Sequence, residues 1–149
     1  MKVVIANDHG GFELKRHLLS YFKEKGIEVV NLGTDSNASV DYPIYGEKLA
    51  REVLKGGYDF GIAICGTGIG ISIAANKFQG IRAALIYDEN TAMLAKEHNN
   101  ANVIALGGRT LTNKRAEELI EAYMNSKFEA RHQHRLDLLG KLGEKTWKN

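Results

Sequence analysis

The chain has 149 residues, of which 44% are hydrophobic and 26% are charged, with a single proline and a single cysteine. This composition is typical of one globular domain and excludes fibrous and intrinsically disordered proteins. A net charge of +2 is too small to indicate a nucleic-acid-binding face. No apolar run approaches the roughly 20 residues that cross a bilayer, and the N-terminus does not read as a secretion signal, so we expect a cytoplasmic protein without membrane contact.

Five short β-branched apolar runs, each bounded by Gly, Asn or Asp, are typical of buried strands. Between the runs, apolar residues recur at helical spacing, and a further helical segment follows the last run. Because parallel strands need crossover connections, this alternation predicts a five-stranded parallel sheet in a three-layer α/β/α sandwich, as a single domain over residues 1–149. The predicted strands cover residues 2–7, 27–32, 59–65, 81–87 and 101–107.

The C-terminal segment lies beyond the last predicted sheet element. From about Phe128 to Trp147 it has an amphipathic pattern, with Leu136, Leu139 and Leu142 about one helical turn apart. We expect this segment to pack on a partner.

The stretch "GIAICGTGIGISIAANK" at residues 61–77 places three glycines directly after Cys65. A dinucleotide fingerprint needs Gly or Ala where Ile71 stands, and a phosphate-binding P-loop needs a lysine well before Lys77. Neither nucleotide motif fits. The loop instead offers backbone N–H groups at the start of a helix, where an anion is favoured.

Cys65 has two interpretations. At a strand end beside these amides, a thiol pKa falls below its usual value of about 8.5, which favours a reactive thiolate. Most free cysteines, however, are small buried hydrophobes, and glycines often only make a tight turn. A single cysteine forms neither an internal disulfide nor a multi-cysteine zinc site.

Polar residues follow other predicted strands, where ligands of open α/β sheets collect. Asp8 and His9 offer a proton-transfer group and a polar contact, or simply a helix N-cap and a solvated loop residue. His98 and Asn99 close the fourth predicted helix, where both are common caps. Arg109 follows the fifth strand and is suited to hold a phosphate.

The C-terminal segment carries a basic cluster, "RHQHR" at residues 131–135. On a helix, Arg131 and Arg135 share one face because they are four residues apart. Such a face is usually solvated, but folded onto a site it would be an anion clamp.

Six stretches carry a resemblance to a known family: "NDHGG" at 7–11, "DYP" at 41–43, "ICGTGIGISIAANK" at 64–77, "GIRAAL" at 80–85, "EHNNANVIALGGR" at 97–109 and "RHQHR" at 131–135. Together they resemble ribose-5-phosphate isomerase type B. The resemblance runs nearly end to end and implies a Rossmann-like sheet, no nucleotide cofactor and no metal. It also implies a homodimer, or a tetramer made of two such dimers, in which the tail from about residue 126, including the C-terminal helix, extends to the partner subunit's active site.

The resemblance also implies roles for individual residues in a pentose phosphate isomerisation. Cys65 would be the base that moves a proton between C1 and C2 of the open-chain sugar, and Thr67 would assist at the neighbouring oxygen. The enediolate oxygen would be held by the backbone amides of the glycine loop, namely Gly66, Thr67, Gly68, Ile69 and Gly70.

The remaining roles concern ring opening and the phosphate. Asp8 and His98 would open the furanose ring, with His98 as proton donor, while His9 and Asn99 contact the substrate. The phosphate would be bound by Arg109 of one subunit together with three tail residues of the other, Arg131, His132 and Arg135.

Two positions place the chain within this group. One branch uses a glutamate as base where Ile71 stands here, so the chain resembles the cysteine branch. Many members have two glycines before the tail arginine, where this chain has Glu129 and Ala130.

Three alternatives remain open. Galactose-6-phosphate isomerase disperses its catalytic groups over two different subunits, whereas all of them occur in this one chain. Six-carbon substrates such as an allose phosphate depend on pocket depth, which the sequence does not display. A flavodoxin-like module that only binds FMN or a phosphorylated metabolite would have no use for Cys65.

Overall fold

The computed structural model describes residues 1–143 and contains a five-stranded, all-parallel sheet in the order β2-β1-β3-β5-β4. All five predicted strands are confirmed. The strands are β1 Lys2–Asn7, β2 Glu28–Asn31, β3 Phe60–Cys65, β4 Ala83–Leu85 and β5 Val103–Gly107. The edge strand β4 is shorter than predicted, because the amide of Ile81 turns back to Phe78 and that of Arg82 donates to the Asn102 side chain.

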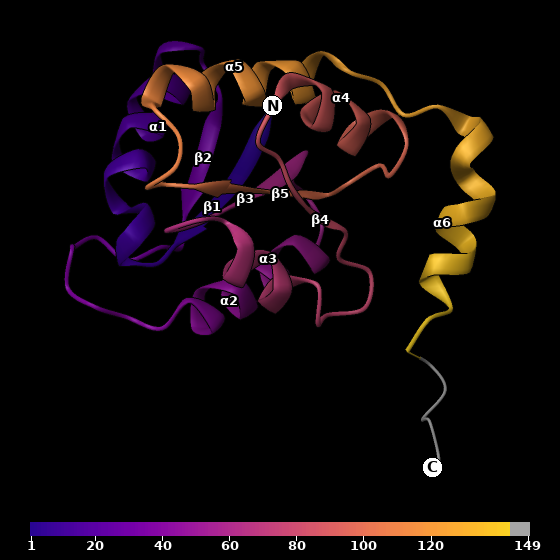
Figure 1. Cartoon of the computed structure of the whole chain (residues 1–149), viewed down its shortest axis with the longest axis horizontal. Coiled ribbons are helices and arrows are strands. Elements are labelled where there is room, and N and C mark those ends of the chain that lie inside the picture. The colour runs from indigo at the N-terminus through magenta and orange to yellow at the C-terminus, as the bar shows by residue number, and fades with distance from the viewer. Residues whose placement is uncertain (144–149) are drawn as a thin grey trace.

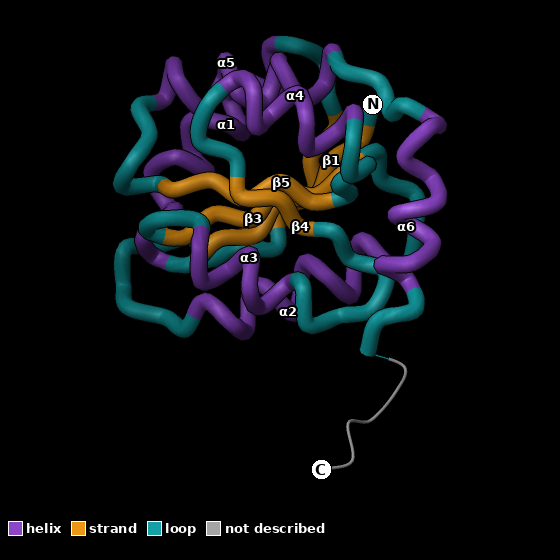
Figure 2. The backbone as a smooth tube through the Cα atoms, turned by 45° about the vertical axis from the view of Figure 1, so that its right-hand side comes forward, coloured by secondary structure: helices purple, strands orange, loops and turns teal. Residues whose placement is uncertain are grey.

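Helices cover both faces of the sheet, which confirms the three-layer sandwich. Figure 1 shows α1, α4 and α5 on one face and α2 and α3 on the other. In Figure 2 the strands form the middle layer. The helices are α1 Phe12–Glu24, α2 Tyr42–Leu54, α3 Ile69–Ala75, α4 Glu89–Glu97, α5 Asn113–Asn125 and α6 Gln133–Gly140, with 3-10 turns at His9–Gly11 and Ala130–His132.

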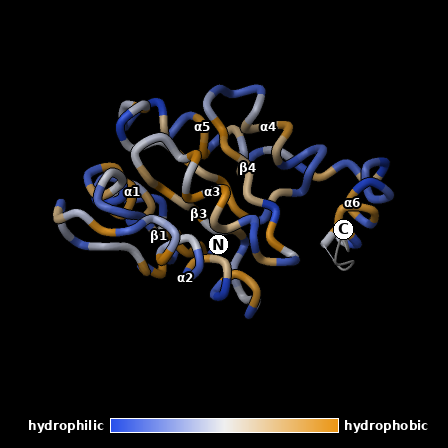
Figure 3. The backbone as a smooth tube through the Cα atoms, turned by 60° about the horizontal axis from the view of Figure 1, so that its bottom comes forward, coloured by the Kyte–Doolittle hydropathy of each residue, from blue (hydrophilic) through white to orange (hydrophobic). Residues whose placement is uncertain are grey.

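Each face of the sheet has its own apolar core, because successive strand residues point to opposite faces. Along β3, Ile62 and Ile64 pack toward α1 and α5, whereas Ala63 and Cys65 pack toward α2 and α3. Cys65 therefore belongs to the thinner core, whose strand residues are mainly alanine and valine. In Figure 3 most hydrophobic backbone lies in the centre of the molecule, and hydrophilic colour dominates the outer loops.

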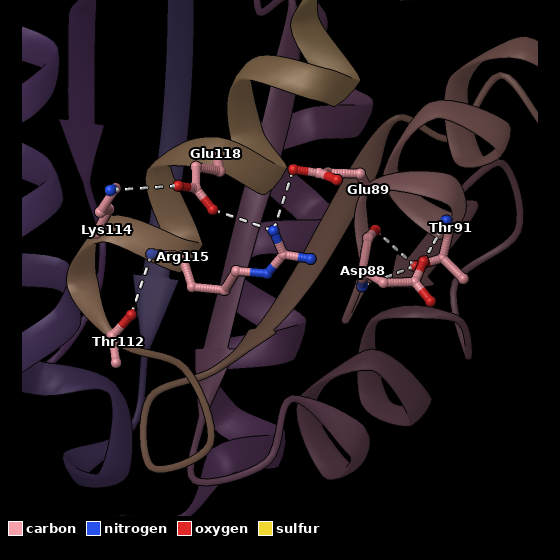
Figure 4. A network of polar contacts seen from close by, with 7 residues as sticks. All are labelled: Asp88, Glu89, Thr91, Thr112, Lys114, Arg115 and Glu118. Atoms are coloured by element: carbon pink, nitrogen blue, oxygen red, sulfur yellow. Dashed lines mark hydrogen bonds and ion pairs between the residues drawn. The ribbon is translucent and has the colours of Figure 1, made fainter.

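A polar network fixes α4 against α5 (Figure 4). Asp88 caps α4 by accepting a hydrogen bond from the Thr91 amide at 2.7 Å. Arg115 of α5 bridges Glu89 at 3.1 Å and Glu118 at 3.0 Å. These groups are partly exposed, so their value is chiefly geometric: they set the direction of α4 and the place where it begins.

The C-terminal helix α6 stands apart from the sandwich at the end nearest α4 and β4 (Figures 1 and 2). Its leucines Leu138 and Leu139 are exposed, as is Leu142 just beyond its C-terminal end. The helix is shorter than the predicted amphipathic segment, and Trp147 lies outside the described residues. Within residues 1–143, no helix has the length and apolar character needed to span a membrane.

Candidate active site

The loops after β1, β3 and β5 are tied together by backbone hydrogen bonds. The amide of Asp8 donates to Ile64 at 3.1 Å, that of Gly108 to Cys65 at 2.8 Å, and that of Arg109 to Gly66 at 2.9 Å. The parallel register of β3 and β5 pairs Cys65 with Gly107, so the loops that follow these two strands begin side by side. Three of the predicted site segments therefore meet at the carboxyl ends of the strands.

Cys65 is 5% exposed, and its sulfur accepts a hydrogen bond from the Gly68 amide at 3.2 Å. Gly68 has a φ of 79°, and a Cβ there would lie 2.8 Å from the backbone carbon of Leu106. Only glycine therefore brings this amide to the sulfur without strain. The thiol is buried, as the filler interpretation expects, and it also faces a backbone donor, as the reactive interpretation requires.

The rest of the glycine loop is closely surrounded. A Cβ on Gly66 would lie 3.2 Å from a guanidinium nitrogen of Arg109, so this arginine covers the loop. The Thr67 hydroxyl accepts a hydrogen bond from the Ile69 amide at 3.3 Å. The structure thus places an exposed cation and an exposed hydroxyl beside the cysteine.

Asp8 lies against the same loop and acts as a cap. Its carboxylate accepts a hydrogen bond from the Gly10 amide at 2.9 Å, and its side chain is only 6% exposed. A Cβ on Gly10 would lie 2.8 Å from the Gly66 nitrogen, so this turn touches the glycine loop. Asp8 is therefore an N-cap, as one interpretation expects, but of the 3-10 turn His9–Gly11 and not of α1, whose N-cap is Gly11. The cap places its carboxylate at the candidate site.

His9 fastens the loop that precedes α2. Its Nδ1 lies 3.2 Å from both the backbone nitrogen and the backbone oxygen of Val40, so the bond it makes depends on its tautomer. This contact brings Tyr42 toward the site. A Cβ on Gly70 would lie 2.9 Å from the Tyr42 ring. The sequence interpretation missed Tyr42, although "DYP" was available as a signal of a helix start beside the loop.

A second cluster gathers the other predicted site residues. The rings of His98 and His132 lie 4.2 Å apart, centre to centre. Glu129 accepts a hydrogen bond from Arg131 Nε at 2.6 Å and lies 3.5 Å from His132 Nε2. Arg135 lies 3.3 Å from His132 Nδ1. Neighbouring Asn99 is exposed, and its backbone oxygen accepts a hydrogen bond from Arg82 at 3.1 Å.

Arg131 and Arg135 do not share one helix. Arg131 lies in the 3-10 turn Ala130–His132, and Arg135 lies on α6, which begins at Gln133. The single basic helix face that the spacing suggests is therefore interrupted, and each arginine has a different partner in the cluster.

Burial and charge set the protonation states in this second cluster. Burial lowers the pKa of His132, and electrostatic repulsion from Arg131 and from the other groups beside it acts in the same direction. The hydrogen bond from Arg131 lowers the pKa of the Glu129 carboxyl. At neutral pH, His132 is therefore a neutral imidazole beside a charged carboxylate.

The first cluster, formed by Asp8, Cys65 and Arg109, lies at the carboxyl ends of the strands. The second cluster, around His98 and His132, lies at their amino ends. Helix α4 returns from the carboxyl end of β4 to the amino end of β5, and His98 is its C-cap. The five residues of β5, at about 3.3 Å each, separate its amino end from its carboxyl end by about 16 Å. Figure 1 agrees, since the chain leaves β5 on the left while the end of α4 and the tail lie on the right. One chain alone does not bring His98 to Cys65.

Comparison with known proteins adds to this geometry. Residues 3–139 match the family model described as Ribose/Galactose Isomerase. Ribose-5-phosphate isomerase B of Escherichia coli is 42% identical over 93% of this chain and 93% of its own length. Among solved structures, ribose-5-phosphate isomerase B of Clostridium thermocellum is 45% identical, with a TM-score of 0.91 over 94% of this chain and 95% of that one.

A further solved structure is ribose-5-phosphate isomerase B of Mycoplasma genitalium with bound ribulose-5-phosphate. It is 38% identical, with a TM-score of 0.90 over 97% of both chains. The family match, the sequence identity and the shared fold each cover nearly the whole chain, so this protein belongs to the ribose/galactose isomerase family.

Proposed function

We propose that the chain interconverts ribose 5-phosphate and ribulose 5-phosphate through an enediolate, as a cytoplasmic enzyme of the pentose phosphate pathway. The observation that carries this proposal is the placement of the Cys65 sulfur 3.2 Å from the Gly68 amide, on a loop that Arg109 covers. This arrangement combines a proton-transfer group, an anion-stabilising backbone and a phosphate-binding cation. The relatives named above support the choice of reaction.

The reaction requires one carbon-bound proton to move. The Cys65 thiolate removes the proton from C2 of the open-chain aldose; the bonding pair forms the C1–C2 double bond, and the carbonyl π pair moves to O1 to give the enediolate. With assistance from Thr67, the O2 hydroxyl proton passes to O1. Return of the carbon-bound proton to C1 then leaves a C=O bond at C2, which gives the ketose. Backbone amides of the loop at residues 66–70 stabilise the anion, and a donor of this kind typically lowers the barrier by about 3 to 4 kcal/mol.

The proposed site needs two subunits. The carboxyl ends of the strands carry Asp8, His9, Cys65 and Arg109. The opposite ends carry His98, Asn99 and the tail. In a homodimer, the partner's His98 would open the sugar ring together with Asp8, and the partner's basic tail would complete the phosphate site. The exposed leucines of α6 and the exposed Ile69 and Ile73 of α3 provide apolar surface for such an interface.

This arrangement predicts complementation between one inactive and one weakly binding variant, measured at a substrate concentration below the raised KM. Cys65→Ala removes the base and should abolish turnover while sparing sugar-phosphate binding, whereas Arg135→Ala should mainly raise KM. A mixed dimer of the two contains one site with neither substitution, so mixing should restore activity. If mixing restores none although exchange of subunits is demonstrated, the shared site is refuted.

The alternatives make different predictions for the same samples. A six-carbon specificity would show faster turnover of allose 6-phosphate than of ribose 5-phosphate. A module that only binds FMN would show flavin absorbance after purification and would keep its ligand affinity in Cys65→Ala.

A further inference from the structure

The second cluster has the composition of a metal site. Within residues 1–143, His98, Glu129 and His132 each offer a ligand atom, and these atoms lie within 4.8 Å of one another. We propose that these three residues bind a divalent transition-metal ion of the Zn²⁺ type. Two imidazoles and one carboxylate form a known zinc ligand set that leaves a fourth coordination position open.

The fold assembles this cluster from two segments far apart in the sequence. The backbone amide of Glu129 donates to the Glu97 oxygen at 2.9 Å, which fixes the start of the tail to the end of α4. The following 3-10 turn places His132 over the His98 ring at 4.2 Å. The ligand spacing is therefore invisible as a sequence motif, which explains why the sequence suggested no metal.

One ligand-to-ligand distance within the cluster already suits a small ion. Ligand atoms about 2.0 to 2.2 Å from zinc in a tetrahedron are about 3.3 to 3.6 Å apart. Glu129 and His132 Nε2 lie 3.5 Å apart. His132 is only 3% exposed, and its Nε2 is buried without a hydrogen-bond partner among residues 1–143. A buried ring nitrogen without a partner is costly, and a bound metal ion would satisfy it.

The charges around the cluster both favour and oppose binding. The carboxylate of Glu129 offers the negative charge that a divalent cation needs among its ligands. Arg131 competes for the Glu129 carboxylate. Arg135 donates to His132 Nδ1 at 3.3 Å, so binding at Nε2 requires the ring proton to move to Nδ1 and Arg135 to turn away. Arg135 is exposed, so only one long hydrogen bond is lost.

Metal binding would have a consequence for catalysis, and this part rests on the proposed function. His98 and His132 are the groups that we assign to ring opening and to the phosphate in the partner's site. An ion that occupies their ring nitrogens would withdraw both from the sugar and inhibit turnover. The binding measurement itself does not depend on any isomerase activity.

The test is calorimetric titration of Zn²⁺ into metal-free protein carrying Cys65→Ala, which removes the thiol as a competing ligand. Glu129→Gln is the test variant and Glu118→Gln its control, because both carboxylates are 40% exposed and paired with an arginine. We expect one ion per chain, with affinity at least about ten-fold weaker in Glu129→Gln and unchanged in Glu118→Gln. Absence of binding, or equal affinity in the two variants, overturns the proposal.

A second measurement uses Co²⁺ as a spectroscopic probe in the Cys65→Ala protein, with Glu118 and Glu129 unsubstituted. Visible bands of four-coordinate Co²⁺ that Zn²⁺ displaces would support the site, and their absence would count against it. Turnover of the unsubstituted protein with Zn²⁺ separates the two proposals. If Zn²⁺ binds with the expected Glu129 dependence but turnover is insensitive, the metal site stands and the role of His98 and His132 in the partner's site fails.

Discussion

The position of Gly68 allows a quantitative test of how the backbone builds the cysteine site. Its φ of 79° is left-handed, and a Cβ would lie 2.7 Å from the Leu85 side chain and 2.8 Å from the Leu106 backbone. The left-handed conformation costs an L-residue about 1 to 2 kcal/mol, and overpacking typically costs about 1 to 3 kcal/mol. Gly68→Ala should therefore lower the free energy of unfolding by about 2 to 5 kcal/mol.

Gly26→Ala is the matched control. Gly26 has a φ of 68°, and a Cβ there would meet nothing within 4 Å, so only the conformational cost of about 1 to 2 kcal/mol applies. Both substitutions reduce the entropy of the unfolded chain equally, so their difference isolates the packing. The assay is urea unfolding followed by circular dichroism at one protein concentration. If Gly68→Ala is no more destabilising than Gly26→Ala, the tight contact with Leu106 is refuted.

Two further predictions concern stability. The buried Tyr123 hydroxyl donates to the Ala101 oxygen at 2.5 Å, so Tyr123→Phe should cost about 1 to 3 kcal/mol in urea unfolding; an unchanged midpoint would contradict this. The lowered pKa of His132 means that below about pH 6.5 the unfolded chain binds more protons than the folded one, so stability should fall as the pH drops through this window. His132→Gln should flatten that slope, and an equal slope in both proteins would remove His132 as its cause.

The fold was predictable because local and global patterns agree. The strand runs are β-branched and continuous, which is the pattern of strands buried on both faces, and the intervening apolar residues keep helical spacing. The limits of β4 were less predictable, since they depend on Asn102, a residue that the chain reaches only after α4. The break between Arg131 and Gln133 also depends on tertiary contacts, because Glu129 is held by the end of α4.

The candidate site was predictable only in its first half. Asp8, Cys65 and Arg109 follow strands whose carboxyl ends meet at one edge, so topology alone brings them together. His98 follows a helix, and a helix that connects two parallel strands ends near the amino end of the second strand. Its association with Glu129 and His132 arises from the path of the tail, which has no periodic signal. Tyr42 was missed because its contact with Gly70 spans two helices.

The central claim, isomerisation through an enediolate with Cys65 as base, is tested most directly by proton NMR of the protein with ribose 5-phosphate in heavy water. The account predicts ribulose 5-phosphate with deuterium at the exchanging carbon, and neither product nor exchange in Cys65→Ala, although that variant still binds the sugar phosphate. Product formation at an undiminished rate in Cys65→Ala, or no product and no exchange in the unsubstituted protein, would contradict it.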